Sequence, residues 1–218
     1  MEEHRIQQQI AIYKTSTKLC EFNDKLKPSP VEFYAHIHAQ GEKLENGTRP
    51  RSCIGLVLQD YSNGTGDKMI RVTANLAPEF FAFALCKVQT GVEMFDFTEE
   101  KIFGDPDQNG MSMVTKVSIK RVSVRQDGTP SNYPWCIVVE NGLGAKEQAQ
   151  TGGVYMKKGS YRKLAGVFVN LNDYDFFKLI LQTSRYINAW ELANAPSRIR
   201  EAQQQLGAMR ERSSANAR

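Results

Sequence analysis

The densest group of side chains that could bind a charged ligand lies at Lys157–Lys163, with the sequence Lys-Lys-Gly-Ser-Tyr-Arg-Lys. Lysine and arginine neutralise phosphate groups, and an aromatic ring can stack on an unpaired base. A glycine in such a turn lets a ligand backbone approach closely. The chemistry that this stretch indicates is binding of single-stranded nucleic acid.

The charge of the chain is unevenly distributed, although its formal net charge is only +4. Residues 111–170 hold nine basic and three acidic residues, and residues 196–218 hold five basic and two acidic residues. Residues 91–110 hold six acidic residues and one basic residue. The basic regions favour a polyanionic partner, with which the acidic segment could compete.

The basic residues of 111–170 alternate with tyrosine and tryptophan on expected strands and turns. Each one taken alone could instead be a surface lysine that blocks edge pairing or an aromatic residue of the core. Trp135 fits the core and a stacking platform equally well. Taken together, the distribution predicts a nucleic-acid-binding set that comprises Lys116, Lys120, Arg121, Lys157, Lys158, Tyr161, Arg162, Lys163, Tyr155 and Tyr34.

Other chemistry has weaker support in the sequence. His36 and His38 would share one face of a strand, but two ligands do not make a zinc site. The four cysteines are scattered without a C-x-x-C spacing, which indicates free thiols and a cytoplasmic location. No Ser/His/Asp or Cys/His set has a recognisable signature. We therefore expect a protein without enzymatic activity, metal or cofactor, and no apolar run is long enough to cross a membrane.

The elements that must position these residues fall into two halves. In the first half, alternation predicts a strand at 31–40, followed by strands at 52–61 and 68–76 and a helix from Pro78 to Val88. Pro28 and Pro30 end an N-terminal extension, residues 1–30. A fourth strand would come either from Ile10–Phe22 or from Val92–Phe97.

The second half repeats this order after an acidic connector, residues 91–110. Strands are predicted at 113–125, with a β-bulge at Lys120-Arg121 where the apolar phase slips, and at 133–140. After a mobile loop, a hairpin is expected from 154–158 and 161–171, turning at Lys158-Gly159-Ser160. Asn172 then caps a helix that Pro196 ends, and a basic, partly disordered tail covers 193–218.

A short motif recurs where each half passes from strand to helix. Asn75-Leu76 precedes Glu79-Phe80-Phe81, and Asn170-Leu171 precedes Asp175-Phe176-Phe177. The strands-then-helix order predicts an α+β fold built from a duplicated antiparallel sheet-then-helix unit, ββββα-ββββα. Residues 31–192 would form one domain of two pseudo-repeats, 31–90 and 111–192.

A duplicated unit of this kind with a basic, aromatic sheet resembles the Whirly and PUR-repeat families. The residues that carry the resemblance are the two motifs above and the basic stretch 157–163, and it covers roughly residues 31–192. It implies two four-stranded sheets, each followed by a helix, packed as a pseudo-dimer that oligomerises further. It also implies binding of single-stranded nucleic acid.

Two functions remain open at this point. The first is binding of single-stranded DNA, favoured over RNA, with low sequence specificity through a basic aromatic sheet face. The second is an oligomeric structural, assembly or protein-interaction module that binds no nucleic acid, in which the basic tail and the acidic connector pair between subunits.

Overall fold

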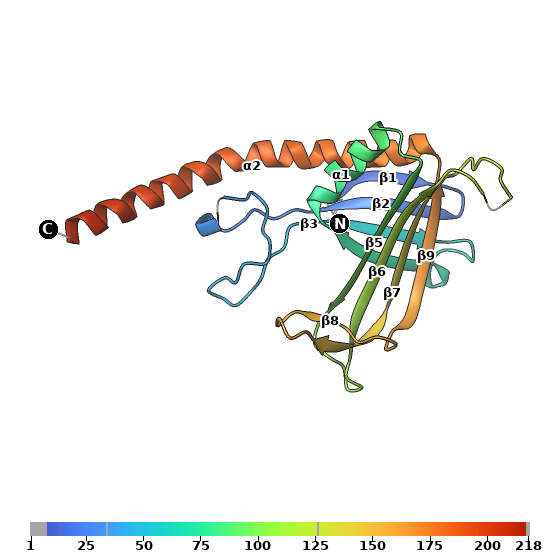
Figure 1. The fold of residues 1–218 in the computed structure, drawn as a ribbon, viewed down its shortest axis with the longest axis horizontal. Helices are drawn as coiled ribbons and strands as arrows, with labels where there is room; N and C mark the ends of the chain where they lie inside the picture. The colour runs from blue at the N-terminus through green and yellow to red at the C-terminus, as the bar shows by residue number, and fades with distance from the viewer. Residues whose placement is uncertain (1–7, 34, 126, 217–218) are drawn as a thin grey trace, which may run out of the picture.

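The computed structural model describes residues 8–33, 35–125 and 127–216, and it has a mixed α+β fold with two antiparallel sheets (Figure 1). The α+β prediction is therefore confirmed. The first sheet contains β1 (Gln9–Lys14), β2 (Lys18–Lys25), β3 (Cys53–Asp60) and β4 (Ile70–Leu76), and α1 (Pro78–Gln89) follows it. The second sheet contains β5 (Met94–Phe103), β6 (Met111–Val122), β7 (Trp135–Gln148), β8 (Val154–Met156) and β9 (Arg162–Leu171), and α2 (Asp173–Asn216) follows it.

The first sheet takes two of its four strands from the N-terminal residues, which were predicted to form an extension. β1 and β2 form a hairpin, and the sheet order is β1-β2-β3-β4. The predicted strand at 31–40 is wrong, since this segment contains the short 3-10 helix η1 (Val31–Phe33) and two isolated bridges. Burial here does not follow the predicted alternation, because the neighbours His38 and Ala39 are both buried. The His38 ring stacks on Trp190 of α2, with 5.0 Å between ring centres.

The acidic segment also contributes a strand. β5 occupies half of the predicted connector and pairs with β6 along ten residue pairs. The predicted β-bulge at Lys120-Arg121 is wrong, because β6 and β7 pair without a register shift from Met111 to Arg121. The apolar phase slips there because Val122 lies at the exposed end of the strand, beyond the core.

The predicted hairpin between 154–158 and 161–171 is wrong in its pairing. β8 and β9 do not pair with each other, and both lie along β7, which continues through the glycines at 142 and 144. The register of β7 and β9 shifts between Asn141 and Gly142. A Cβ atom at Gly142 would lie 2.7 Å from the Tyr161 ring, so glycine is required for this approach.

The helices begin as the sequence predicts. Pro78 is the first residue of α1, and the Asp175 amide donates to the Asn172 side-chain oxygen at 2.8 Å in α2. The predicted end of α2 at Pro196 is wrong, because the helix continues through this proline to Asn216 and extends beyond the sheets (Figure 1).

One apolar core is shared by both sheets and both helices. Trp135 is buried and stacks on Phe176 of α2 with 3.7 Å between ring centres. Phe22 of β2 packs edge-on against Phe81 of α1 with 5.0 Å between ring centres.

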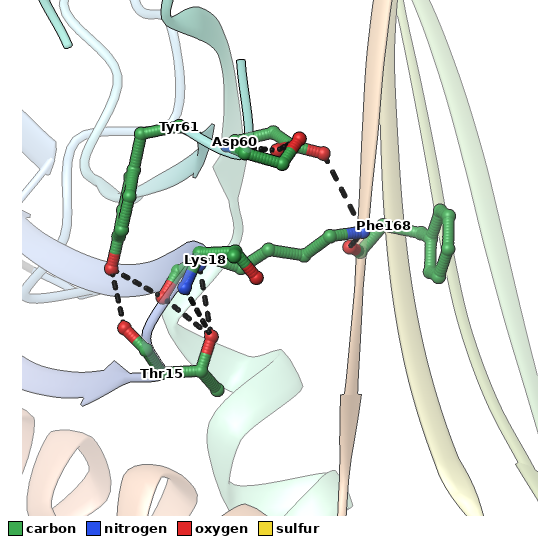
Figure 2. Close-up of polar contacts among 7 residues, drawn as sticks. Thr15, Lys18, Asp60, Tyr61 and Phe168 are labelled. Carbon is green, nitrogen blue, oxygen red and sulfur yellow. Dashed lines mark hydrogen bonds and ion pairs between the residues drawn. The ribbon is translucent and has the colours of Figure 1, made fainter. Parts of the chain in front are cut away.

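Asn141 and Lys18 make two of the polar contacts that join the sheets. The Asn141 side chain accepts from the Thr73 amide at 2.9 Å and donates to the Thr73 carbonyl at 2.8 Å, which satisfies backbone groups of β4. Figure 2 shows the other contact, in which Lys18 of β2 reaches β9 and donates to the Phe168 carbonyl at 2.9 Å. Asp60 lies 3.6 Å from the same ammonium group. Each contact therefore holds the backbone of one sheet with side chains of the other.

No helix in the described ranges has the length and apolar character that a membrane span requires.

Candidate nucleic-acid interface

The outer face of the second sheet carries part of the predicted set, but its lysines are paired. Asp96 lies opposite Lys120 and Glu100 lies opposite Lys116 in the β5–β6 ladder. The resulting ion pairs have N···O distances of 2.9 Å and 2.8 Å. Cross-strand pairs of opposite charge stabilise a sheet, so these lysines are neutralised where they lie.

Tyr161 and Lys163 also lie in a network on this face. The Lys163 ammonium group is 2.6 Å from a Glu140 oxygen, and the Tyr161 hydroxyl donates to Glu140 at 3.3 Å. The Lys116 ammonium group lies 4.0 Å from the centre of the Tyr161 ring. Burial, together with Glu140, raises the pKa of Tyr161 to about 12. The Tyr161 ring is packed against the protein and is therefore a poor platform for a base.

Arg121 points away from the other predicted cations and ties β6 to the start of α2. Its guanidinium group donates to both Asp173 oxygens, at 2.9 Å and 3.1 Å, and to the Glu93 carbonyl. The Trp135 indole N–H donates to Asp173 at 2.7 Å. The hydrogen bond from Arg121 is the main reason that the pKa of Asp173 lies below its ordinary value. Of the two readings left open for Trp135, the structure supports the core.

The remaining cations gather where β8 ends and β9 begins, and we call Tyr155, Lys157, Lys158 and Arg162 the basic turn. All four side chains are exposed, and its three cations make no ion pair with any residue that the structure describes. The turn is held by the Ser160 amide, which donates to the Lys157 carbonyl at 3.1 Å. Gly159 has φ +79°, a left-handed conformation that glycine adopts without strain.

The predicted set thus contains a paired group on the sheet face, Arg121 paired at the start of α2, and a group at the basic turn that forms no ion pair with described residues. Tyr34, the remaining member, lies outside the described residues.

A second basic region was not predicted. A cavity of about 620 Å³ lies between the two sheets, and Lys25, Arg51 and Lys101 line it together with Cys53 and Asn75. These cations come from β2, from the residues before β3 and from β5. They are far apart in the sequence, so no local pattern reveals the cluster.

The two histidines do not share a strand face. His36 pairs with Glu42 at 3.1 Å. Both ring nitrogens of His38 have protein partners, Ser52 at 2.8 Å and Glu191 at 3.0 Å. These histidines lie in a loop, and His38 holds that loop against α2.

The chain matches no protein-family model, no curated protein and no solved structure. No family is therefore assigned, and the likeness to Whirly and PUR-repeat proteins stays a prediction.

Proposed function

We propose that this protein binds single-stranded nucleic acid with little sequence specificity, and that the basic turn makes the first contact. DNA is favoured over RNA, and no catalytic step is involved. The observation that carries the proposal is the group of three unpaired, exposed cations beside an exposed tyrosine. Cations that are already free lose no internal partner when they meet a phosphate.

The paired lysines of the sheet face would act second. Lys116, Lys120 and Lys163 can exchange a carboxylate for a phosphate, but the carboxylate is then left without its partner. This exchange lowers the net gain of each contact. The sheet face would therefore extend the binding path with less free energy per cation than the basic turn supplies.

A duplicated ββββα unit, as in Whirly and PUR-repeat proteins, is part of the same proposal. The ladder registers support it, because Thr73 lies opposite Val57 and Phe168 lies opposite Val138. Asp60 lies three residues after Val57, and Asn141 lies three residues after Val138. Asp60 pairs with Lys18 in its ladder and Asn141 pairs with Thr115.

The contacts that Asn141 and Lys18 make between the sheets then occupy equivalent positions. In each half, a polar pair on the second and third strands holds the edge strand of the other half, at Thr73 or at Phe168. Polar pairs at equivalent ladder positions, each binding the backbone of the other half, favour an internal duplication over a chance likeness of two sheets.

The test is a titration of the full chain into a fluorescent oligothymidylate, followed by anisotropy at several salt concentrations. We expect the logarithm of the association constant to fall linearly with the logarithm of salt concentration. The double substitution Lys157→Glu and Lys158→Glu should weaken binding and reduce this slope by about 1.4, since two phosphate contacts of a single strand are lost.

The matched control is Lys14→Glu with Lys68→Glu, which changes the net charge equally at exposed positions outside the basic turn. The control should keep the wild-type slope. Equal losses in both double variants, or a lack of binding by the wild type at low salt, would contradict the proposal.

A second candidate function is assembly, and one observation favours it. α2 extends beyond the sheets and carries an exposed apolar row on this extension, which includes Leu192, Ile199 and Met209. A long helix whose exposed apolar residues have no partner in the described chain gains stability when that face packs against another chain. In this alternative the protein is an oligomeric module, and nucleic acid has no part in it.

A further inference from the structure

We propose that the cavity between the sheets is a binding site for a phosphate group, which Lys25 and Lys101 hold at the point where both reach Asn75. The proposal does not depend on nucleic-acid binding, because it requires a phosphate group and not a nucleic-acid chain; only its internal comparison rests on the proposed duplication. The group could belong to inorganic phosphate, to a nucleotide or to the backbone of a single strand.

The geometry brings two ammonium groups from different sheets to one residue. Lys25 of β2 donates to the Asn75 side-chain oxygen at 3.0 Å. Lys101 of β5 donates to the Asn75 backbone carbonyl at 2.9 Å. Two ammonium groups that bind one residue repel each other, and an anion that both contact would be attracted to both.

The surroundings add further positive charge. Arg51 lies on the wall of the same cavity, and an adjoining cavity of about 500 Å³ shares Lys25 and Arg51 and adds Lys27. Neither Arg51 nor Lys27 forms an ion pair with a residue of the described ranges.

Two carboxylates line the cavities, and both have partners. Glu99 lies 2.9 Å from Lys101, and Asp24 accepts from the Leu26 amide at 2.8 Å and from the Tyr186 hydroxyl at 2.7 Å. Four cations therefore face two engaged carboxylates, and the excess positive charge suits an anion.

The second half of the chain offers an internal comparison. Asn170 occupies the place of Asn75, one residue before the end of its strand. In the first sheet, Lys25 lies opposite Cys53. At the equivalent place in the second sheet, the Val122 amide donates to the Pro134 carbonyl at 2.8 Å, so Val122 corresponds to Lys25. An apolar residue thus stands where the first half has a lysine. The sheet-then-helix framework does not require a cation there, which favours a ligand as the reason for Lys25.

Cys53 provides a reporter inside the cavity. Its thiol is partly buried, and burial raises its pKa while Lys25, Lys101 and Lys27 oppose that rise. A ligand that occupies the cavity should shield this thiol from alkylation. In a Cys86→Ser, Cys136→Ser variant, the only cysteine besides Cys53 is the fully buried Cys20, so alkylation reports on Cys53.

The experiment measures the rate of Cys53 alkylation by N-ethylmaleimide in the full chain of this variant. The probes are inorganic phosphate, thymidine monophosphate and a short oligothymidylate. At ten times the dissociation constant, a bound probe that blocks the thiol should slow the reaction about tenfold. Lys25→Gln with Lys101→Gln should abolish this protection, while Lys14→Gln with Lys68→Gln should preserve it.

The three probes separate the sources of the phosphate. Protection by all three probes indicates that the phosphate group suffices for binding. Protection by the nucleotide or the oligonucleotide but not by inorganic phosphate indicates that the protein also contacts the attached sugar or base. An unchanged rate with every probe overturns the proposal, as does protection that survives the Lys25/Lys101 substitution. If the oligonucleotide binds by anisotropy without protecting Cys53, the proposed function stands and this site fails. If phosphate protects Cys53 while no oligonucleotide binds, the phosphate site stands and the proposed function fails.

Discussion

Asp173 has three roles through one carboxylate at the junction of β6, β7 and α2. It accepts from Arg121 and from the Trp135 indole, and it lies in the first turn of α2, where the helix dipole favours negative charge. More than half of its side chain is exposed, so solvent screens the ion pair with Arg121. Its contribution to stability is therefore modest but depends on pH.

We expect Asp173→Asn to lower the free energy of unfolding by about 1 kcal/mol at neutral pH, since an acceptor for Trp135 is kept but the charge is lost. The pKa of Asp173 is depressed in the folded protein. The stabilisation is thus complete above the pKa of an unfolded aspartate and disappears as pH falls through the folded value. Urea denaturation of wild type and variant should converge at acid pH.

Asp67→Asn is the control for this prediction, because Asp67 is exposed and forms no ion pair with described residues. The free energies of unfolding of wild type and Asp173→Asn should become equal at acid pH. If their difference persists there unchanged, the ion pair does not cause it.

β5 decides how much of the positive charge on the second sheet is available. The acidic residues of this strand lie next to β6 in the sheet, and two of them pair with Lys116 and Lys120. The segment that was predicted to be a connector thus neutralises lysines on the sheet face that was predicted to bind nucleic acid. If the proposed function holds, a phosphate chain would compete with these carboxylates for the lysines.

Removal of the two carboxylates tests this competition. Asp96→Asn with Glu100→Gln should strengthen oligothymidylate binding and steepen the salt dependence by about 1.4 in slope, because two lysines become free for phosphates. The control Asp67→Asn with Glu45→Gln removes the same charge from exposed sites elsewhere. If both variants gain equally, only the net charge matters and the pairing in the ladder does not limit binding.

At the scale of the whole molecule, α2 gives the protein an elongated shape, since its C-terminal part projects away from the two sheets (Figure 1). Pro196 and Gly207 lie inside this helix, and both residues weaken a helix interior. A partner would offset that weakness. The mass of the particle in solution therefore separates the two candidate functions.

If assembly is the function, light scattering of the full chain should give a multiple of 24.6 kDa, with or without oligonucleotide. Leu192→Lys with Met209→Lys should then restore the monomer mass, because charges enter the apolar row. Ala193→Lys with Gln204→Lys adds the same charge to exposed positions outside that row and should not. A full chain that is monomeric at all concentrations would exclude the assembly function for α2.

The sequence by itself determined the local structure where neighbouring residues decide it. The Asn172 cap, Pro78 at the start of α1 and the alternation in β6 depend on residues within one or two turns of each other, so their patterns can be read directly. The order of sheets and helices followed from these elements. At residues 31–40 the alternation gave a wrong prediction, because a tertiary contact with α2 buries His38, a residue of the predicted polar face.

Only the tertiary structure decided which charges are free. Whether Lys116 faces a carboxylate depends on the register of β5 against β6, and whether Lys25 meets Lys101 depends on how two sheets cross. These contacts join residues far apart in the chain, and a shift of one residue in a ladder would move every side chain to the other face. The basic stretch 157–163 that the sequence singled out therefore keeps its turn as a candidate binding surface, while Tyr161 and Lys163 are engaged by Glu140.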